Sequence, residues 1–291
     1  MKEKMPSYGG QAVIEGVLMR GKTAVAMAVR TPEGNIEVVN EDLTGVYKSK
    51  LTKIPFLRGL IILWDALGLG MKYLTISANF QTGEDEKIEG PTLYITVAFS
   101  LLLGIGLFFL APAALAAWVE KLTNIAPGWI NLLEGLIRLA ILISYLLIIG
   151  QLPDIKRTFA YHGAEHKTIN AYEADIELLP EKVSKVSREH PRCGTSFILT
   201  LVVISVLLFS LLPPLALHWR LVSRLLLIPF VAGISYEYIR FISNHIENPI
   251  IKVISKPNLA LQKLTTREPT IEMLEVAIFA FQNMYKNEIR L

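Results

Sequence analysis

Two histidines, His162 and His166, stand four residues apart, and Glu165 directly precedes the second. On a helix, side chains at this spacing share a face, so both imidazoles can bind one metal ion. The carboxylate between them would then lie close enough to polarise a water molecule bound to that ion. This H-x-x-E-H spacing is the pattern of the inverted zinc peptidases. The segment therefore predicts a metal site, with Glu165 as its candidate catalytic base.

Two further metal-binding residue types, His190 and Cys193, follow later in the same segment. Imidazole and thiolate both bind Zn²⁺ well, and four such ligands complete a tetrahedral site. If His162, His166 and one more residue hold the ion, an open position beside the glutamate makes the site catalytic. If all four ligands bind it, the site is closed and structural. The sequence leaves both interpretations open, together with a third in which these residues bind no metal and are ordinary groups at a membrane surface.

The chain is unusually apolar, since 52% of its 291 residues are hydrophobic, 19% are charged and the mean hydropathy is +0.43. This composition is typical of a membrane protein, so a lipid bilayer is an expected partner. The net charge of +3 does not predict a nucleic-acid partner. The single cysteine excludes an intramolecular disulfide. We expect no cleavable signal peptide, because the first residues lack an apolar core.

Four segments are each close to the roughly 20 residues that a bilayer core requires. The first two lie within residues 93–150 and the last two form a helical hairpin over residues 197–243. Their predicted bounds are 93–119, 130–150, 197–219 and 221–243.

Residues 54–80 are also apolar, but Arg58, Asp65 and Lys72 are spaced seven apart and form one polar stripe on a helix. A helix that faces lipid on all sides would tolerate that stripe poorly. The pattern favours an amphipathic helix at the membrane interface over a true span.

The remaining segments are soluble in character. Residues 1–53 predict a small domain with a β-hairpin, whose strands at 24–30 and 36–39 flank a turn, and we expect the glycines of residues 9–21 to serve tight turns. Residues 244–291 predict a tail with a C-terminal helix capped by Thr270. The expected fold is mainly α: a polytopic helical membrane protein with about four spans, one interfacial or re-entrant helix and a small β-containing N-terminal domain.

Basic residues set the expected orientation. The loop at 151–196 carries seven Lys and Arg residues, whereas the opposite connection at 120–129 carries only Lys121. By the positive-inside rule, this loop is cytoplasmic, and four spans place both termini on the same side.

Ionisable residues also occur inside the predicted spans, where such groups are usually functional or paired. Glu237 is a candidate catalytic residue near the cytoplasmic end of its span, although it could instead pair with Arg240. Glu134 and Arg138 are four residues apart and favour a structural ion pair.

Four segments of this chain resemble the YqhQ family of bacterial membrane proteins. They are GGQAVIEGVLMRG at 9–21, YHGAEHKTINAYE at 161–173, HPRCGTSF at 190–197 and LQKLTTREP at 261–269. Members of that family are of unknown function and are described as predicted metal-dependent enzymes. The resemblance implies a multi-pass protein of the bacterial cytoplasmic (inner) membrane. It also implies a candidate site made of His162, Glu165, His166, His190 and Cys193.

Together these features predict a cytoplasm-facing zinc site in a hydrolase that acts on a membrane-associated peptide or lipid. Glu165 would be the general base, and Glu237 or Arg240 would face the substrate. The alternative is a non-enzymatic scaffold or membrane-protein biogenesis factor, in which zinc only folds the 151–196 loop and other membrane proteins are the partners. An open metal position beside Glu165 favours the enzyme, and a filled tetrahedron of ligands favours the scaffold.

Overall fold

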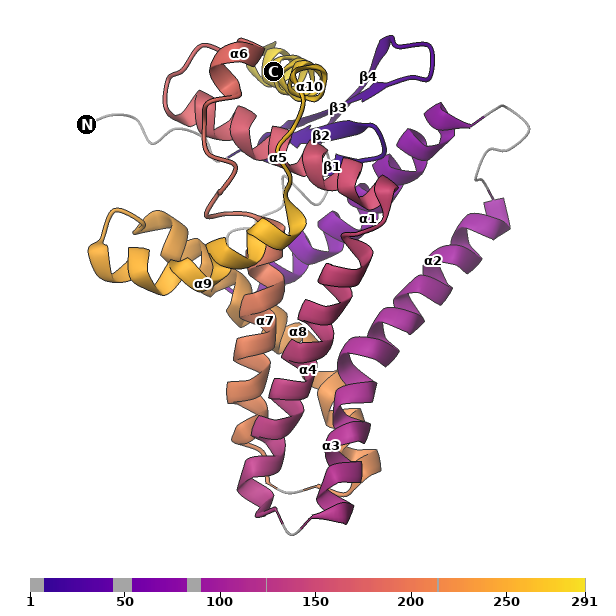
Figure 1. Cartoon of the computed structure of the whole chain (residues 1–291), viewed down its shortest axis with the longest axis vertical. Helices are drawn as coiled ribbons and strands as arrows, with labels where there is room; N and C mark the ends of the chain where they lie inside the picture. The colour runs from indigo at the N-terminus through magenta and orange to yellow at the C-terminus, as the bar shows by residue number, and fades with distance from the viewer. Residues whose placement is uncertain (1–7, 44–53, 83–89, 124, 214, 291) are drawn as a thin grey trace.

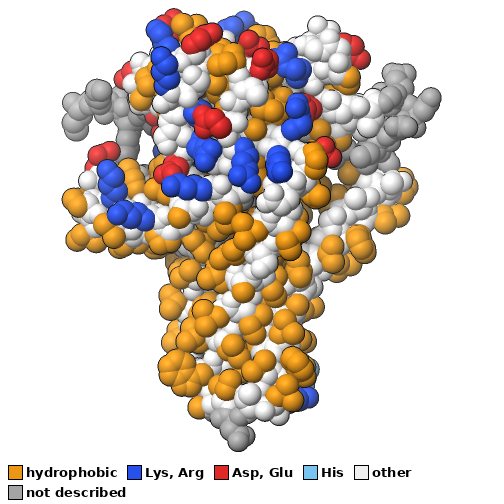
Figure 2. Space-filling model, viewed as in Figure 1, with side chains coloured by type: hydrophobic (Ala, Val, Ile, Leu, Met, Phe, Trp, Pro, Cys, Tyr) orange, Lys and Arg blue, Asp and Glu red, His pale blue; other side chains and the backbone are white. Residues whose placement is uncertain are grey.

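The computed structural model describes residues 8–43, 54–82, 90–123, 125–213 and 215–290. The chain has two parts that lie one above the other (Figure 1). The upper part is a small β-sheet packed with helices. The lower part is a bundle of long apolar helices, whose surface is almost entirely hydrophobic in Figure 2.

The sheet is antiparallel, and its strands lie in chain order: β1 (Gly9–Val13), β2 (Gly16–Arg20), β3 (Ala24–Arg30) and β4 (Ile36–Asp42). The predicted hairpin is present as β3 and β4. The expectation that the glycines of 9–21 mainly serve tight turns is wrong, because most of that segment forms the strands of a second hairpin. Its tight turn is confined to Ile14 and Glu15, where Glu15 has a φ of 52°.

Both faces of the sheet are buried. Successive side chains of a strand point to opposite faces. Val17, Met19 and Ala28 belong to the cluster formed with α5 (Pro153–Glu173) and α10 (Ile271–Arg290). Their neighbours Leu18, Met27 and Val29 pack instead against α1 (Leu57–Gln81). This two-sided burial explains why β3 is a nearly continuous apolar run rather than an alternating one.

The segment 151–196 is not a loop. Its first half is largely α5, and a short α6 (Pro180–Val183) follows. The helical spacing assumed for the two histidines is therefore present. The tail also contains the predicted C-terminal helix, α10, whose Met273 backbone N–H donates to Thr270 Oγ1 at 3.4 Å, as a cap should.

A second helix in the tail, α9 (Pro249–Thr265), was not predicted. Pro257 lies in its interior and argues against a helix when the sequence is read alone. In Figure 1, α9 lies crosswise between the upper part and the bundle.

The helix α1 connects the sheet to the bundle. Its Arg58 forms an ion pair with Glu237 on α8 (Leu217–Asn244), and its Lys72 pairs with Glu41 of β4. Two charges of the predicted polar stripe are thus paired within the protein, and the Asp65 side chain lies outside the described atoms.

Three helices among the described residues are long and apolar enough to cross a membrane: Gly90–Leu122, Trp129–Ile149 and Leu217–Asn244. They indicate a membrane protein. The first is continuous through α2 (Gly90–Ile105), the π-helical segment η4 (Gly106–Leu110) and α3 (Ala111–Leu122), and the second is the apolar part of α4 (Pro127–Ile149).

The predicted span at 197–219 differs from the structure. The helix there, α7 (Gly194–Ser210), is 17 residues long and ends well before Trp219, which belongs to α8. Pro213 lies in the connection and has no N–H with which to continue a helix. Hence α7 is a shorter apolar helix than the other three.

The predicted pair of Glu134 and Arg138 is present inside the bundle, with 2.7 Å between the nearest carboxylate oxygen and guanidinium nitrogen. Arg224 of α8 binds the second oxygen of the same carboxylate at 2.9 Å. All three residues are 1% exposed. The Phe209 ring lies 4.2 Å from the Arg224 guanidinium carbon, and the Phe108 carbonyl, within η4, accepts from Arg138 Nε at 2.9 Å. One carboxylate therefore holds two buried arginines.

Candidate metal centre

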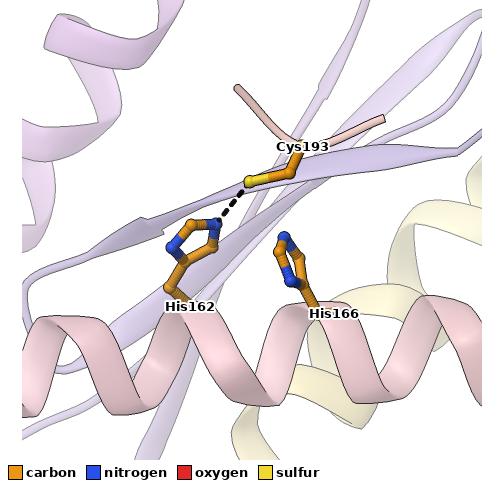
Figure 3. Close-up of side chains that lie close together, drawn as sticks. All are labelled: His162, His166 and Cys193. Carbon is orange, nitrogen blue, oxygen red and sulfur yellow. Dashed lines mark hydrogen bonds between the residues drawn. The ribbon is translucent and has the colours of Figure 1, made fainter. Parts of the chain in front are cut away.

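His162 and His166 of α5 converge with Cys193, the residue before α7, and their side chains lie together beside α5 (Figure 3). The two histidines stand on consecutive turns of α5, and their ring centroids are 4.4 Å apart. Cys193 is the residue before α7, and its Sγ accepts the Thr195 backbone N–H at 3.4 Å. One donor atom from each of the three side chains lies within 4.8 Å of the other two. Their types and closeness are those of a metal-ligand set.

The orientation of both imidazoles is set by backbone carbonyls. Nδ1 of His162 lies 2.9 Å from the Thr265 oxygen, and Nδ1 of His166 lies 2.6 Å from the Arg188 oxygen. A carbonyl oxygen can only accept, so each Nδ1 carries the proton and donates it. In the neutral ring Nε2 is then left with a free lone pair. Metal-binding histidines are commonly held in this way.

One donor–donor distance of the cluster is close to that of a tetrahedral zinc site. With bonds of about 2.1 Å to nitrogen and about 2.3 Å to sulfur, tetrahedral ligand atoms stand roughly 3.3–3.6 Å apart. Nε2 of His162 is 3.3 Å from Cys193 Sγ. A set of two imidazoles and one thiolate favours zinc over Mg²⁺ or Ca²⁺, which prefer oxygen.

Glu165 lies beside this cluster and is 4% exposed. Its Oε2 is 3.9 Å from Nε2 of His162. Burial raises the pKa of the carboxyl group to about 7, although the nearby His162 acts in the opposite direction. Gly10 of β1 makes room for it, since a Cβ added there would lie 2.8 Å from Glu165 Cγ. A buried carboxyl group beside these donors is a candidate general base.

His190 is not part of the three-residue cluster. Its ring lies next to His166, with 5.7 Å between centroids, and its Nε2 is 3.6 Å from an oxygen of Glu173. Glu173 also pairs with Arg192. Burial lowers the pKa of His190, while the nearby carboxylate of Glu173 acts in the opposite direction. Nε2 of His190 is buried and makes no hydrogen bond within the described part of the chain.

Glu237 is engaged elsewhere. Its Oε1 accepts from Arg58 Nε at 2.6 Å and from the Phe56 backbone N–H at 3.2 Å. Arg58 comes from α1, so the ion-pair partner lies far away in the sequence rather than three residues on. The structure does not bring Glu237 into the set of His162, His166 and Cys193.

Other residues hold α5 and the segment before α7 in place without showing a metal-binding pattern. Gln262 holds the backbone of His190 from both sides, accepting from its N–H at 3.0 Å and donating to its carbonyl at 2.8 Å. Glu15 accepts two hydrogen bonds from Arg157 of α5, at 2.6 and 2.5 Å. In the sequence, only the resemblance to the YqhQ family points to these two residues. Glu15 belongs to the family-like segment 9–21, and Gln262 belongs to the segment 261–269. All four segments meet around α5.

Gly163 allows the segment after α9 to reach α5. The Arg267 backbone N–H donates to the Phe159 carbonyl at 2.8 Å, and a Cβ added to Gly163 would lie 2.2 Å from the Arg267 carbonyl oxygen. We expect Gly163→Ala to push this segment away and to weaken its hydrogen bond to His162. Overpacking of this kind costs about 1–3 kcal/mol. Thermal unfolding and zinc content of the purified protein measure both effects.

The control is Gly68→Ala, at a helical glycine where an added Cβ meets nothing within 4 Å. It should be neutral or slightly stabilising, because alanine is the better helix former. Equal melting temperatures for the two variants would contradict the close-packing argument.

Comparison with known proteins identifies similar sequences but no solved structure, since none matches this chain. The sequence profile of a family described as "Protein of unknown function (DUF1385)" matches residues 54–287. The "Uncharacterized protein YqhQ" of Bacillus subtilis (strain 168) is 37% identical over 300 residues, which cover 97% of this chain and 93% of that protein.

Proposed function

This chain belongs to the DUF1385 family and is a relative of YqhQ of Bacillus subtilis, and we propose that it is a zinc-dependent hydrolase acting at the membrane surface. The observation that carries the proposal is the convergence of His162, His166 and Cys193 with Glu165 beside them. Three ligands leave a fourth position of a tetrahedral ion for water or substrate, as in catalytic zinc sites.

The roles of the residues follow from their positions. His162, His166 and Cys193 would hold the ion, which when bound supplies Lewis acidity and makes water easier to deprotonate. Glu165 would take the proton from the attacking water and return it to the leaving group. Its carboxylate is close enough to the ligands for this, since Oε2 lies 3.9 Å from Nε2 of His162.

The substrate we propose is a membrane-associated peptide or lipid. The centre is attached directly to the apolar helices, because α5 begins just after α4 ends and Cys193 immediately precedes α7. We further propose that the protein lies in the bacterial inner membrane, with the sheet and the centre on the cytoplasmic side. The Lys and Arg residues seen on the upper part in Figure 2 support that orientation.

A second candidate function is a non-enzymatic scaffold in which zinc is structural. The observation that favours it is the buried Nε2 of His190, which makes no hydrogen bond in the described part of the chain and belongs to a ring adjacent to His166. A rotation of that ring toward the cluster would supply a fourth ligand and close the site.

Replacing Glu165 by glutamine separates the two functions. The amide keeps the shape of the side chain but cannot accept a proton, so an enzyme should lose about 10²–10⁴-fold in rate. We expect Glu165→Gln to keep its zinc and its melting temperature and to fail to complement a strain that lacks the gene. Zinc analysis, thermal unfolding and complementation are measured on the same variant.

The control for this test is Glu177→Gln, at an exposed glutamate that pairs only with Lys182 among the described residues. It should complement fully. If Glu165→Gln also complemented fully while His190→Ala released zinc, the scaffold would replace the hydrolase as the better explanation.

A further inference from the structure

The helix α9 has three distinct faces. The first contacts the protein: Ser255, Leu261, Gln262 and Thr265 are buried, and the helix packs against α7 and α4. The second is apolar and exposed, with Ile250, Val253 and Ile254 at 69%, 59% and 45% exposure. The third carries Lys252, Lys256 and Lys263, all exposed.

Of the three lysines on this face, one forms an ion pair within the described part of the chain and two do not. Lys263 pairs with Glu189 at 3.4 Å. Lys252 and Lys256 are four residues apart, so they lie on one side of the helix, and the described residues contain no ion pair for either. An unpaired cationic side next to an exposed apolar side is the pattern of a helix that lies in a membrane interface.

The position of α9 in the molecule agrees with this pattern. In Figure 2, α9 projects sideways at the boundary between the charged upper part and the hydrophobic bundle. Basic side chains lie on this projection above hydrophobic ones. Its exposed apolar side is therefore continuous with the hydrophobic belt of the bundle. If the bundle is in the bilayer, α9 lies level with the headgroups.

We propose that α9 is a membrane-surface helix that binds anionic phospholipid. Ile250, Val253 and Ile254 would enter the boundary between headgroups and acyl chains. Lys252 and Lys256 would contact the phosphates of anionic lipids, which attract basic residues near the membrane surface. The occupant of this face is the bilayer itself, because an apolar side and a cationic side next to each other match its two layers.

The lipid contact is linked to the candidate metal centre through the end of α9. Thr265, its last residue, supplies the carbonyl that orients His162, and Gln262 holds the His190 backbone. A surface that fixes α9 thus also fixes the groups that orient the cluster. The lipid contact stands without the proposed function, and only its effect on the centre rests on that function.

The test uses the full chain in liposomes with a fluorescent label on a cysteine introduced at position 253. Cys193 is 5% exposed, so labelling of the folded protein is selective for the introduced cysteine. Lipids with brominated acyl chains quench a label that lies among them. We expect strong quenching for Val253→Cys and weak quenching for the matched control Lys256→Cys, on the lysine face of the same helix. Equal quenching at the two positions would overturn the interfacial placement.

A second measurement tests the anionic lipid. Bromine is carried in turn by phosphatidylglycerol and by phosphatidylcholine, and the ratio of quenching reports which lipid lies next to α9. We expect a ratio above one that falls to about one in Lys252→Gln with Lys256→Gln, because basic residues near the surface are what attracts the anionic lipid. An unchanged ratio in this double variant would refute the headgroup contact.

Zinc content is measured on the same preparations, so that the two proposals fail separately. Normal quenching without bound zinc would count against the metal centre and leave the lipid contact in place. Bound zinc with no quenching at position 253 would count against the lipid contact and leave the metal centre in place.

Discussion

Replacing His162 and His166 together by alanine is expected to reduce bound zinc from about one ion per chain to none, because Cys193 alone cannot hold a tetrahedral ion. The two histidines supply two of the three clustered donors. Structural zinc in small sites contributes about 10–16 kcal/mol of apparent binding free energy, so the loss of two ligands should abolish binding at any practical concentration. Metal analysis of protein purified without chelators measures the effect.

The control for this variant is His218→Ala with His245→Ala, which removes two histidines outside the cluster. Both are exposed, and Nδ1 of His245 bonds only within its own turn, to the Phe241 carbonyl. This protein should keep its zinc. Unchanged metal content in the His162 and His166 variant would end the proposal for this site, and with it the hydrolase.

Replacing Glu134 by alanine is expected to cause the largest loss of stability among single substitutions in the bundle. The change leaves Arg138 and Arg224 buried, at 1% exposure each, without their shared carboxylate. Removing one partner of a buried ion pair costs about 3–5 kcal/mol, because the remaining charge is uncompensated. The two like charges would also repel each other. Thermal unfolding in detergent should show the loss.

A triple variant distinguishes the charge effect from the loss of packing. In Glu134→Leu with Arg138→Met and Arg224→Met, all three of these buried charges are gone and side chains of similar volume fill the space. Replacement of buried ion pairs by apolar residues is often neutral or stabilising, so much of the stability should return. A triple variant as unstable as Glu134→Ala would show that the packing, and not the charge balance, is what matters.

The parts of the fold that could be predicted from the sequence depend on residues that are close together in the chain. His162 and His166 share a helix, and spacing alone places them together. The hairpin of β3 and β4 has a turn between two apolar runs, and Thr270 is a cap next to its helix. Each of these needs only neighbours within a few positions.

What sequence reasoning could not predict depends on contacts between distant residues or on main-chain atoms. Glu237 is bound by Arg58, which is 179 residues away. The groups that orient the two imidazoles are carbonyls of Thr265 and Arg188, and a carbonyl is present at every position, so no residue type reveals it. His190 has the right type and spacing for a ligand, yet its ring is placed by the turn before α7 and faces Glu173.

Segments from both ends of the described chain close around α5. Glu15 and Gly10 contact it from the N-terminal side, and Thr265 and Arg267 contact it from the C-terminal side, while α10 covers the face of β2 and β3. During synthesis on the ribosome, the His162 ring therefore lacks the carbonyl that orients it until Thr265 has been added. The sheet keeps an open apolar face until residues 271–290 emerge. We therefore expect the cluster of His162, His166 and Cys193 to be completed late in synthesis, and a nascent chain that stalls before that point to leave this apolar face open to chaperones and proteases.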